Sequence, residues 1–195
     1  LTAMAKAVAY VQRRDYVVPK DIQVTFPQVI AHRLLLAAAL ADGVSTVKNV
    51  ALSQDIEATL RCMAALGASW EQADKSTLRV TGIGGKRKPF PELPRFDCGE
   101  SGSTLRFLIP IALAVAGGGV FTGRGRLMER PQSVYETLYR EQDLRFEQNS
   151  AGLTVEGALT PGEYRLAGNV SSQFISGLPV SYTHLRAHET VLDLV

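Results

Sequence analysis

The residue types best suited to chemistry lie in a polar turn that leads into an apolar helix, at residues 97–113. Gly102 lets the backbone turn tightly and come close to a ligand. Ser103 is one of several hydroxyl residues near the start of this helix, whose first amides have no partner within it. Together with the helix dipole, these amides favour an anion, and Arg106 adds a planar, charged fork. An ordinary capped helix with a surface arginine is the alternative interpretation.

Three other segments have the same character. Arg33 follows His32 at the start of an apolar run, and residues 123–131 bring Arg126 and Arg130 close together. The last segment places two hydroxyls and an amide before an apolar stretch: Ser171, Ser172 and Gln173. Guanidinium forks suit carboxylate and phosphate oxygens. Taken singly, these segments are solvated basic turns or simple caps; taken together, they predict a site for a small, multiply anionic ligand.

Composition narrows the class of protein. The chain has 195 residues, a formal net charge of +2, 46% hydrophobic and 21% charged residues, which is typical of a soluble globular protein. So small a charge does not by itself suggest nucleic acid or a membrane surface as the partner. The two cysteines make no disulfide framework, and no Cys/His cluster has zinc-site spacing. We therefore expect a cytoplasmic protein without a metal. No Ser-His-Asp set is present, and the pattern identifies no catalytic residue.

The order of elements predicts an α/β (α+β) fold of repeated β/α units with mixed sheets. The first unit is expected to have a strand at 15–26 ended by Pro27, a helix at 31–41, a strand at 44–50, a helix from Ser53 to Gly67 and a hairpin at 69–80. The second is expected to have a helix opening near Arg106, a strand at 119–123, a helix at 132–140 and strands within 144–156. A third, incomplete unit begins with a strand at 164–166. The repeats span about 20–80, 97–157 and 164–178, after an N-terminal extension at 1–14 with a short helix.

Residues 97–107, 122–131 and 171–178 together resemble the EPSP synthase family, the 3-phosphoshikimate 1-carboxyvinyltransferases of the shikimate pathway. They match, in order, its G-x-x-G-[ST]-x-x-R, R-x-x-x-R-P and S-S-Q-F segments. The resemblance implies that residues 15–178 are a partial enolpyruvyltransferase domain, most of the first of two. The family's repeated β/α units pack their helices inside the sheets, which agrees with the repeat.

The resemblance also implies a transferase of aromatic amino acid (chorismate) biosynthesis that is the target of glyphosate. It moves the enolpyruvyl group of phosphoenolpyruvate to the 5-hydroxyl of shikimate 3-phosphate, and no cofactor is implied. The implied ligands of shikimate 3-phosphate are Arg33, Ser171, Ser172 and Gln173; those of phosphoenolpyruvate are Gly102, Arg130 and Gln173; and Ser103, Arg106 and Arg126 support the site. The full-length protein is expected to be a cytoplasmic monomer with no nucleic-acid or membrane partner.

The sequence departs from the family's pattern in three places. Residues 27–33 lack the Lys-Ser pair that contacts both substrates in the family, and the second domain with its carboxylates is missing. Because domain closure completes the site in this family, we expect this chain to be inactive on its own. Residues 179–195 do not match the pattern, and we interpret them as an artefactual, foreign tail without a function.

Two other functions stay open at this point. The sister enolpyruvyltransferase acting on UDP-N-acetylglucosamine shares the repeated fold, but it lacks the S-S-Q-F pattern. A non-catalytic anion-binding or scaffold domain is the other alternative. Titration with shikimate 3-phosphate and with UDP-N-acetylglucosamine separates these hypotheses, since the scaffold would bind neither.

Overall fold

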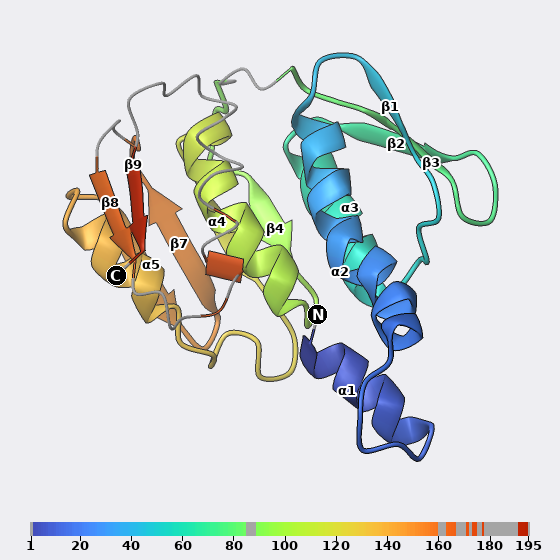
Figure 1. The fold of residues 1–195 in the computed structure, drawn as a ribbon. Helices are drawn as coiled ribbons and strands as arrows, with labels where there is room; N and C mark the ends of the chain where they lie inside the picture. The colour runs from blue at the N-terminus through green and yellow to red at the C-terminus, as the bar shows by residue number, and fades with distance from the viewer. Residues whose placement is uncertain are drawn as a thin grey trace.

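The computed structural model describes residues 2–84, 89–159, 163–166, 171, 173–174, 177 and 191–194. In this part of the chain, helices and small sheets alternate in two halves that lie side by side, with a short first helix below them (Figure 1). No helix among the described residues is long and apolar enough to cross a membrane.

The first half contains three helices and one sheet. Its elements are α1 (Thr2–Val11), α2 (Pro19–Leu40), β1 (Val44–Val47), α3 (Gln54–Ala65), β2 (Ser69–Gln72) and β3 (Leu78–Thr81). The strands form an antiparallel sheet in the order β1-β3-β2.

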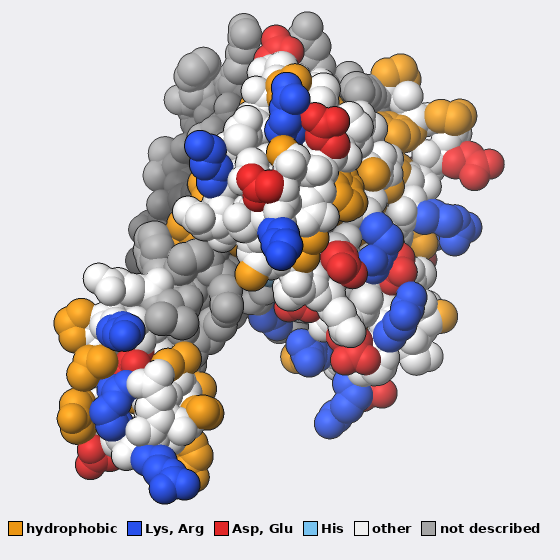
Figure 2. Space-filling model, turned by 90° about the vertical axis from the view of Figure 1, so that its right-hand side faces the viewer, with side chains coloured by type: hydrophobic (Ala, Val, Ile, Leu, Met, Phe, Trp, Pro, Cys, Tyr) orange, Lys and Arg blue, Asp and Glu red, His pale blue; other side chains and the backbone are white. Residues whose placement is uncertain are grey.

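Figure 2 shows a side view of the molecule, on which acidic and basic side chains are interspersed. This agrees with the small net charge of the whole chain.

The second half has a mixed sheet. Its elements are β4 (Arg95–Asp97), α4 (Gly102–Ala116), β5 (Gly118–Thr122), α5 (Ser133–Arg140), β6 (Arg145–Asn149) and β7 (Gly152–Glu156). The sheet order is β4-β5-β7-β6, in which β4 and β5 are parallel and the other pairs are antiparallel. Two further strands, β8 (Glu163–Leu166) and β9 (Val191–Leu194), form a parallel pair.

The repeat predicted from the sequence is visible in the connectivity of the two halves. In each half a long helix leads into a strand, then a second helix, then two strands: α2-β1-α3-β2-β3 and α4-β5-α5-β6-β7. In each sheet the last of these strands pairs antiparallel with both the first strand and its hairpin partner. The α/β fold, the mixed sheet and the repeat are therefore confirmed, while the unit boundaries stay predictions.

The predicted strand at 15–26 is wrong, because a single helix runs from Pro19 to Leu40. Pro19 suits the first helical turn, where its fixed φ is favourable and its missing N–H is not needed. The Asp21 carboxylate accepts a hydrogen bond from the amide of Val18 at 2.9 Å and pairs with Arg14 at 2.7 Å. This N-terminal cap starts a helix where a partial alternation of apolar residues had suggested a strand. Pro27, predicted to end the strand, lies inside α2.

The helix α4 forms the centre of the core and bears the first predicted site residues. Eleven of its residues from Thr104 to Val115 are buried, and it packs against β5, β7 and α3. Ser101 caps it by accepting a hydrogen bond from the amide of Thr104 at 3.2 Å. Gly117 ends it with a φ of 75°, a left-handed conformation in which glycine has no steric penalty. The Ser101 cap and the left-handed Gly117 therefore set where the helix begins and ends.

Candidate anion-binding site

The start of α4 leaves a space that an arginine fills. A Cβ placed on Gly102 would lie 3.1 Å from the Nη1 atom of Arg130. That distance is shorter than an ordinary van der Waals contact, so a side chain at Gly102 would push against the guanidinium. The structure thus brings together two residues predicted to share a ligand, although they are 28 positions apart in the sequence.

The guanidinium of Arg130 has no counter-ion in the described part of the chain. Most other arginines there are in ion pairs with carboxylates: Arg14, Arg61, Arg79, Arg124, Arg126, Arg140 and Arg145. The exposed Arg130 has neither an ion pair nor a side-chain hydrogen bond to any described residue. Its positive charge is therefore available to an anion.

Arg106 is held by neutral groups. Its Nη1 atom donates to Oε1 of Gln173 at 2.8 Å, and its guanidinium carbon lies 4.6 Å from the centre of the Phe174 ring. The amide nitrogen of Gln173 in turn donates to the hydroxyl of Ser103 at 2.7 Å. Gln173 therefore bridges two predicted site residues on the first turns of α4. None of these contacts cancels the charge of Arg106.

Electrostatics favour a bound anion at this place. Burial lowers the pKa of the Arg106 guanidinium below its ordinary value, and the nearby charge of Arg130 acts in the same direction. Two arginines that repel each other without a carboxylate between them gain from an anion that both can contact. The hydroxyl of Tyr135, on α5, donates to the carbonyl of Arg106 at 2.9 Å and so fixes the helix turn beneath it.

The other predicted residues lie in different environments. Arg33 is on α2, and its guanidinium carbon is 4.9 Å from the centre of the Phe107 ring of α4, so the first unit reaches the second beside Arg106. Arg126 is 87% exposed and paired with Glu129 at 3.1 Å. Ser171 is exposed, and its hydroxyl accepts from the amide of Gln173 at 3.4 Å. Ser172 lies outside the described residues.

A hollow of about 330 Å³ lies on the arginine turn. It is lined by Arg126, Glu129, Arg130 and Pro131. Its volume is within the range of small-ligand clefts. The described residues contain no group of three or more His, Cys, Asp or Glu side chains that could hold a metal ion.

Sequence reasoning missed a buried polar network that joins the two units. Nδ1 of His32 lies 2.9 Å from the hydroxyl of Thr59, which lies 2.8 Å from the hydroxyl of Thr104. The hydroxyl of Thr104 is 2.8 Å from that of Ser101, the cap of α4. The network connects the helix that bears Arg33 with the first turn of α4. Its members are far apart in the sequence, so no local pattern could indicate it.

His32 makes the stability of the fold dependent on pH. Burial lowers the pKa of His32, although Asp55 opposes this shift and Arg33 adds to it. Below the unfolded pKa of about 6.5, the unfolded chain therefore binds a proton more readily than the folded chain. The stability that His32 contributes is complete above that pH and is lost as the pH falls, by at most about 1.4 kcal/mol per pH unit.

We therefore expect the variant His32→Gln to lose less stability on acidification than the parent chain. Glutamine can keep a hydrogen bond to Thr59, but it does not titrate. Urea unfolding between about pH 5 and about pH 8 measures the difference. Equal slopes for parent and variant across this range would contradict the assignment.

The site and the repeats together define a class: a β/α repeat domain in which Arg106 and Arg130 lie at the start of a buried helix with no carboxylate partner among the described residues. The family model of EPSP synthase (3-phosphoshikimate 1-carboxyvinyltransferase) matches residues 18–193, and the chain belongs to this family. The match extends into the segment 179–195 that we interpreted as foreign, and that interpretation remains a prediction.

Curated relatives with 40–44% sequence identity carry the name of the same family. The 3-phosphoshikimate 1-carboxyvinyltransferase of Clostridium novyi (strain NT) is 44% identical over 168 residues, which cover 81% of this chain and 38% of the relative. That of Clostridioides difficile (strain 630) is 40% identical over 167 residues, with the same coverage. The EPSP synthase structure from Acinetobacter baumannii superimposes with a TM-score of 0.68 at 23% identity, covering 79% of this chain and 36% of that one. The chain thus spans less than two-fifths of the length of these relatives.

Proposed function

We propose that this chain is the substrate-binding part of an enzyme that transfers the enolpyruvyl group of phosphoenolpyruvate to the 5-hydroxyl of shikimate 3-phosphate. Gly102, Arg130 and Gln173 would hold phosphoenolpyruvate, and glyphosate would compete there. Arg33, Ser171, Ser172 and Gln173 would hold shikimate 3-phosphate, with Ser103, Arg106 and Arg126 in support. The full-length protein would be a cytoplasmic monomer that acts on these small molecules.

The observation that carries this proposal is the pair Arg106 and Arg130 at the start of α4, neither of which has a carboxylate partner among the described residues. Bringing two anions together is unfavourable in water, and fixed positive charge and amides that already point at the ligand reduce that cost. The neutral partners of Arg106 and the close approach of the Arg130 guanidinium to Gly102 serve this purpose. Gln173, placed between Ser103 and Arg106, is suited to contact both ligands.

Residues 27–33, which lack the family's Lys-Ser pair, fall within the continuous helix α2. We therefore propose that this chain binds its substrates without turning them over. We expect activity from a chain of the relatives' full length that carries the Lys-Ser segment.

Isothermal titration with shikimate 3-phosphate tests the proposal. We expect a dissociation constant of about 1 mM or tighter, equivalent to at least about 4 kcal/mol, and no release of phosphate when phosphoenolpyruvate is added. Binding of UDP-N-acetylglucosamine instead would favour the sister enolpyruvyltransferase. Binding of neither ligand would contradict the proposal and favour a scaffold.

A further inference from the structure

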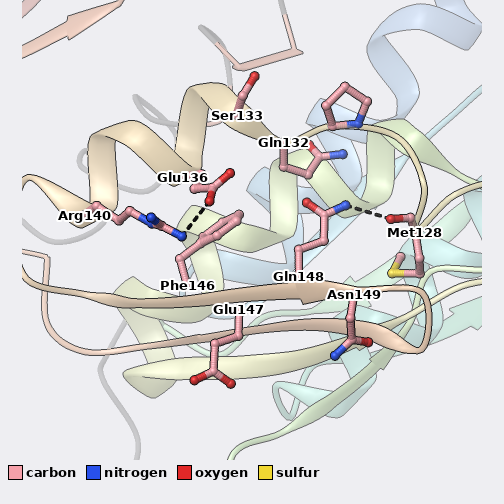
Figure 3. Close-up of a pocket in the computed structure, with 10 residues that line it drawn as sticks. Met128, Gln132, Ser133, Glu136, Arg140, Phe146, Glu147, Gln148 and Asn149 are labelled. Carbon is pink, nitrogen blue, oxygen red and sulfur yellow. Dashed lines mark hydrogen bonds and ion pairs between the residues drawn. The ribbon is translucent and has the colours of Figure 1, made fainter.

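A glutamine stands on the inner face of β6, where an apolar residue would be expected. Side chains alternate along a strand, so Gln148 shares a face with the buried Phe146, while Glu147 and Asn149 belong to the other face. Figure 3 shows Phe146 and Gln148 pointing towards α5 and the turn that precedes it, and Glu147 pointing away. They line a hollow of about 550 Å³ between β6 and α5.

Both N–H groups of the Gln148 amide have acceptors in the arginine turn, residues 123–131. Its Nε2 atom donates to the carbonyl of Met128 at 2.7 Å (Figure 3) and to the carbonyl of Arg130 at 3.0 Å. A primary amide has two donors, so this one is fully used on two carbonyls that are two residues apart. From β6, Gln148 thereby links the carbonyls of Met128 and Arg130.

A second amide reaches the same carbonyl. Gln132, which is 1% exposed, donates from Nε2 to the carbonyl of Arg130 at 3.3 Å. Its Oε1 atom accepts from Nε of Arg106 at 3.4 Å. The two lone pairs of the Arg130 carbonyl are therefore both used. Gln132 also links the backbone of one site arginine to the side chain of the other.

We propose that Gln148 and Gln132 are positioning residues that hold Arg130 over Gly102 so that its guanidinium meets the anion of phosphoenolpyruvate. This inference rests on the proposed function. Arg130 is exposed and has no counter-ion in the described part of the chain, so its own side-chain contacts do not fix it. The backbone that carries the guanidinium must supply the order instead, and the two amides fix that backbone at its carbonyl.

The first measurement needs no ligand. The amides of Leu127, Glu129 and Arg130 donate within the turn, so their hydrogen exchange reports whether the turn opens. Gln148→Met removes both donors but keeps the length of the side chain, and we expect exchange at these amides to accelerate about tenfold. Gln72→Met, at an exposed position of β2, is the matched control and should leave these rates unchanged.

The second measurement is the affinity for phosphoenolpyruvate in the presence of shikimate 3-phosphate. Gln148→Met should weaken it about threefold to tenfold, while the affinity for shikimate 3-phosphate alone stays as in the parent. Gln148→Glu has no donor at neutral pH but regains one when its carboxyl is protonated. Its deficit relative to the parent should therefore shrink on acidification, whereas that of Gln148→Met should not. The Glu136–Arg140 pair lines the same hollow and is present in every variant. Its effect on binding therefore cancels in the ratio of variant affinity to parent affinity at each pH.

The outcomes separate the two claims. The positioning role is overturned if Gln148→Met leaves hydrogen exchange in the turn unchanged. It is also overturned if the parent binds phosphoenolpyruvate and Gln148→Met binds it with equal affinity. A parent that binds neither ligand defeats the proposed function, and the exchange rates then still decide whether Gln148 holds the backbone of Arg130. An equal loss of affinity for both ligands would indicate general destabilisation and would also overturn the proposal.

Discussion

Replacing Arg130 by alanine is expected to weaken phosphoenolpyruvate binding about tenfold or more, because a charge-assisted hydrogen bond is worth about 1.5–3 kcal/mol. The fold should be unaffected, since the guanidinium is exposed and has no partner among the described residues. The melting temperature should stay within about 2 °C of the parent value. Titration calorimetry in the presence of shikimate 3-phosphate and a thermal melt measure the two quantities.

Arg79→Ala is the matched control for Arg130→Ala. It removes the same charge from an exposed arginine, but Arg79 lies on β3 and is paired with Glu71 at 3.2 Å. We expect its phosphoenolpyruvate affinity to equal that of the parent. Arg126→Ala should fall between the two, because Glu129 neutralises part of its charge. If Arg79→Ala and Arg130→Ala weaken binding equally, net charge and not position would be responsible, and the site assignment would be wrong.

The segments that could be predicted from the sequence are those whose structure is decided locally. Ser101 caps α4 through the amide of Thr104, and Gly117 ends the helix. Both are short-range effects of residue type. The repeat was visible because each unit returns to the same order of helices and strands. A local signal of this kind placed Gly102 and Arg106 on the first turns of α4, where the structure has them.

Other features depend on contacts that a linear pattern does not contain. The strand predicted at 15–26 failed because the ion pair of Asp21 with Arg14 and the cap on Val18 start a helix instead. The meeting of Gly102 with Arg130 depends on the turn after β5 folding back over α4. The amide of Gln148 reaches the carbonyls of that turn only because β6 lies beside it. The amide of Gln132 meets Arg106 only because the turn lies against α4. The one available signal was a glutamine on the apolar face of a strand.

Charge balance explains why these contacts belong to one site. Most other described arginines are paired with carboxylates, whereas Arg106 is held by the amides of Gln132 and Gln173 and by an aromatic ring. Amides can fix a guanidinium without cancelling its charge. A fold that needed only stability would gain more from a carboxylate at this place. The neutral partners therefore leave the charge of Arg106 available to an external anion.

The core of α4 should contribute most to stability, and Leu108→Ala is expected to cost about 2–5 kcal/mol of unfolding free energy. Leu108 is fully buried, and truncating it leaves a cavity in a helix surrounded by packed neighbours. Out of a total of about 5–15 kcal/mol for a typical domain, this loss is large. At about 2–4 °C per kcal/mol for a chain of this size, the melting temperature should fall by roughly 4–20 °C.

Leu34→Ala is the control that isolates burial from residue type. Leu34 lies in the apolar run of α2, yet the residue is 46% exposed. Both substitutions replace leucine by alanine within a helix, so intrinsic helix propensity changes equally. We expect a cost of about 1 kcal/mol or less for Leu34→Ala, because little apolar area is lost from the interior. Similar costs for the two variants in urea unfolding would show that α4 is not the centre of the core. The placement of Gly102 and Arg106 by that helix would then lose its physical basis.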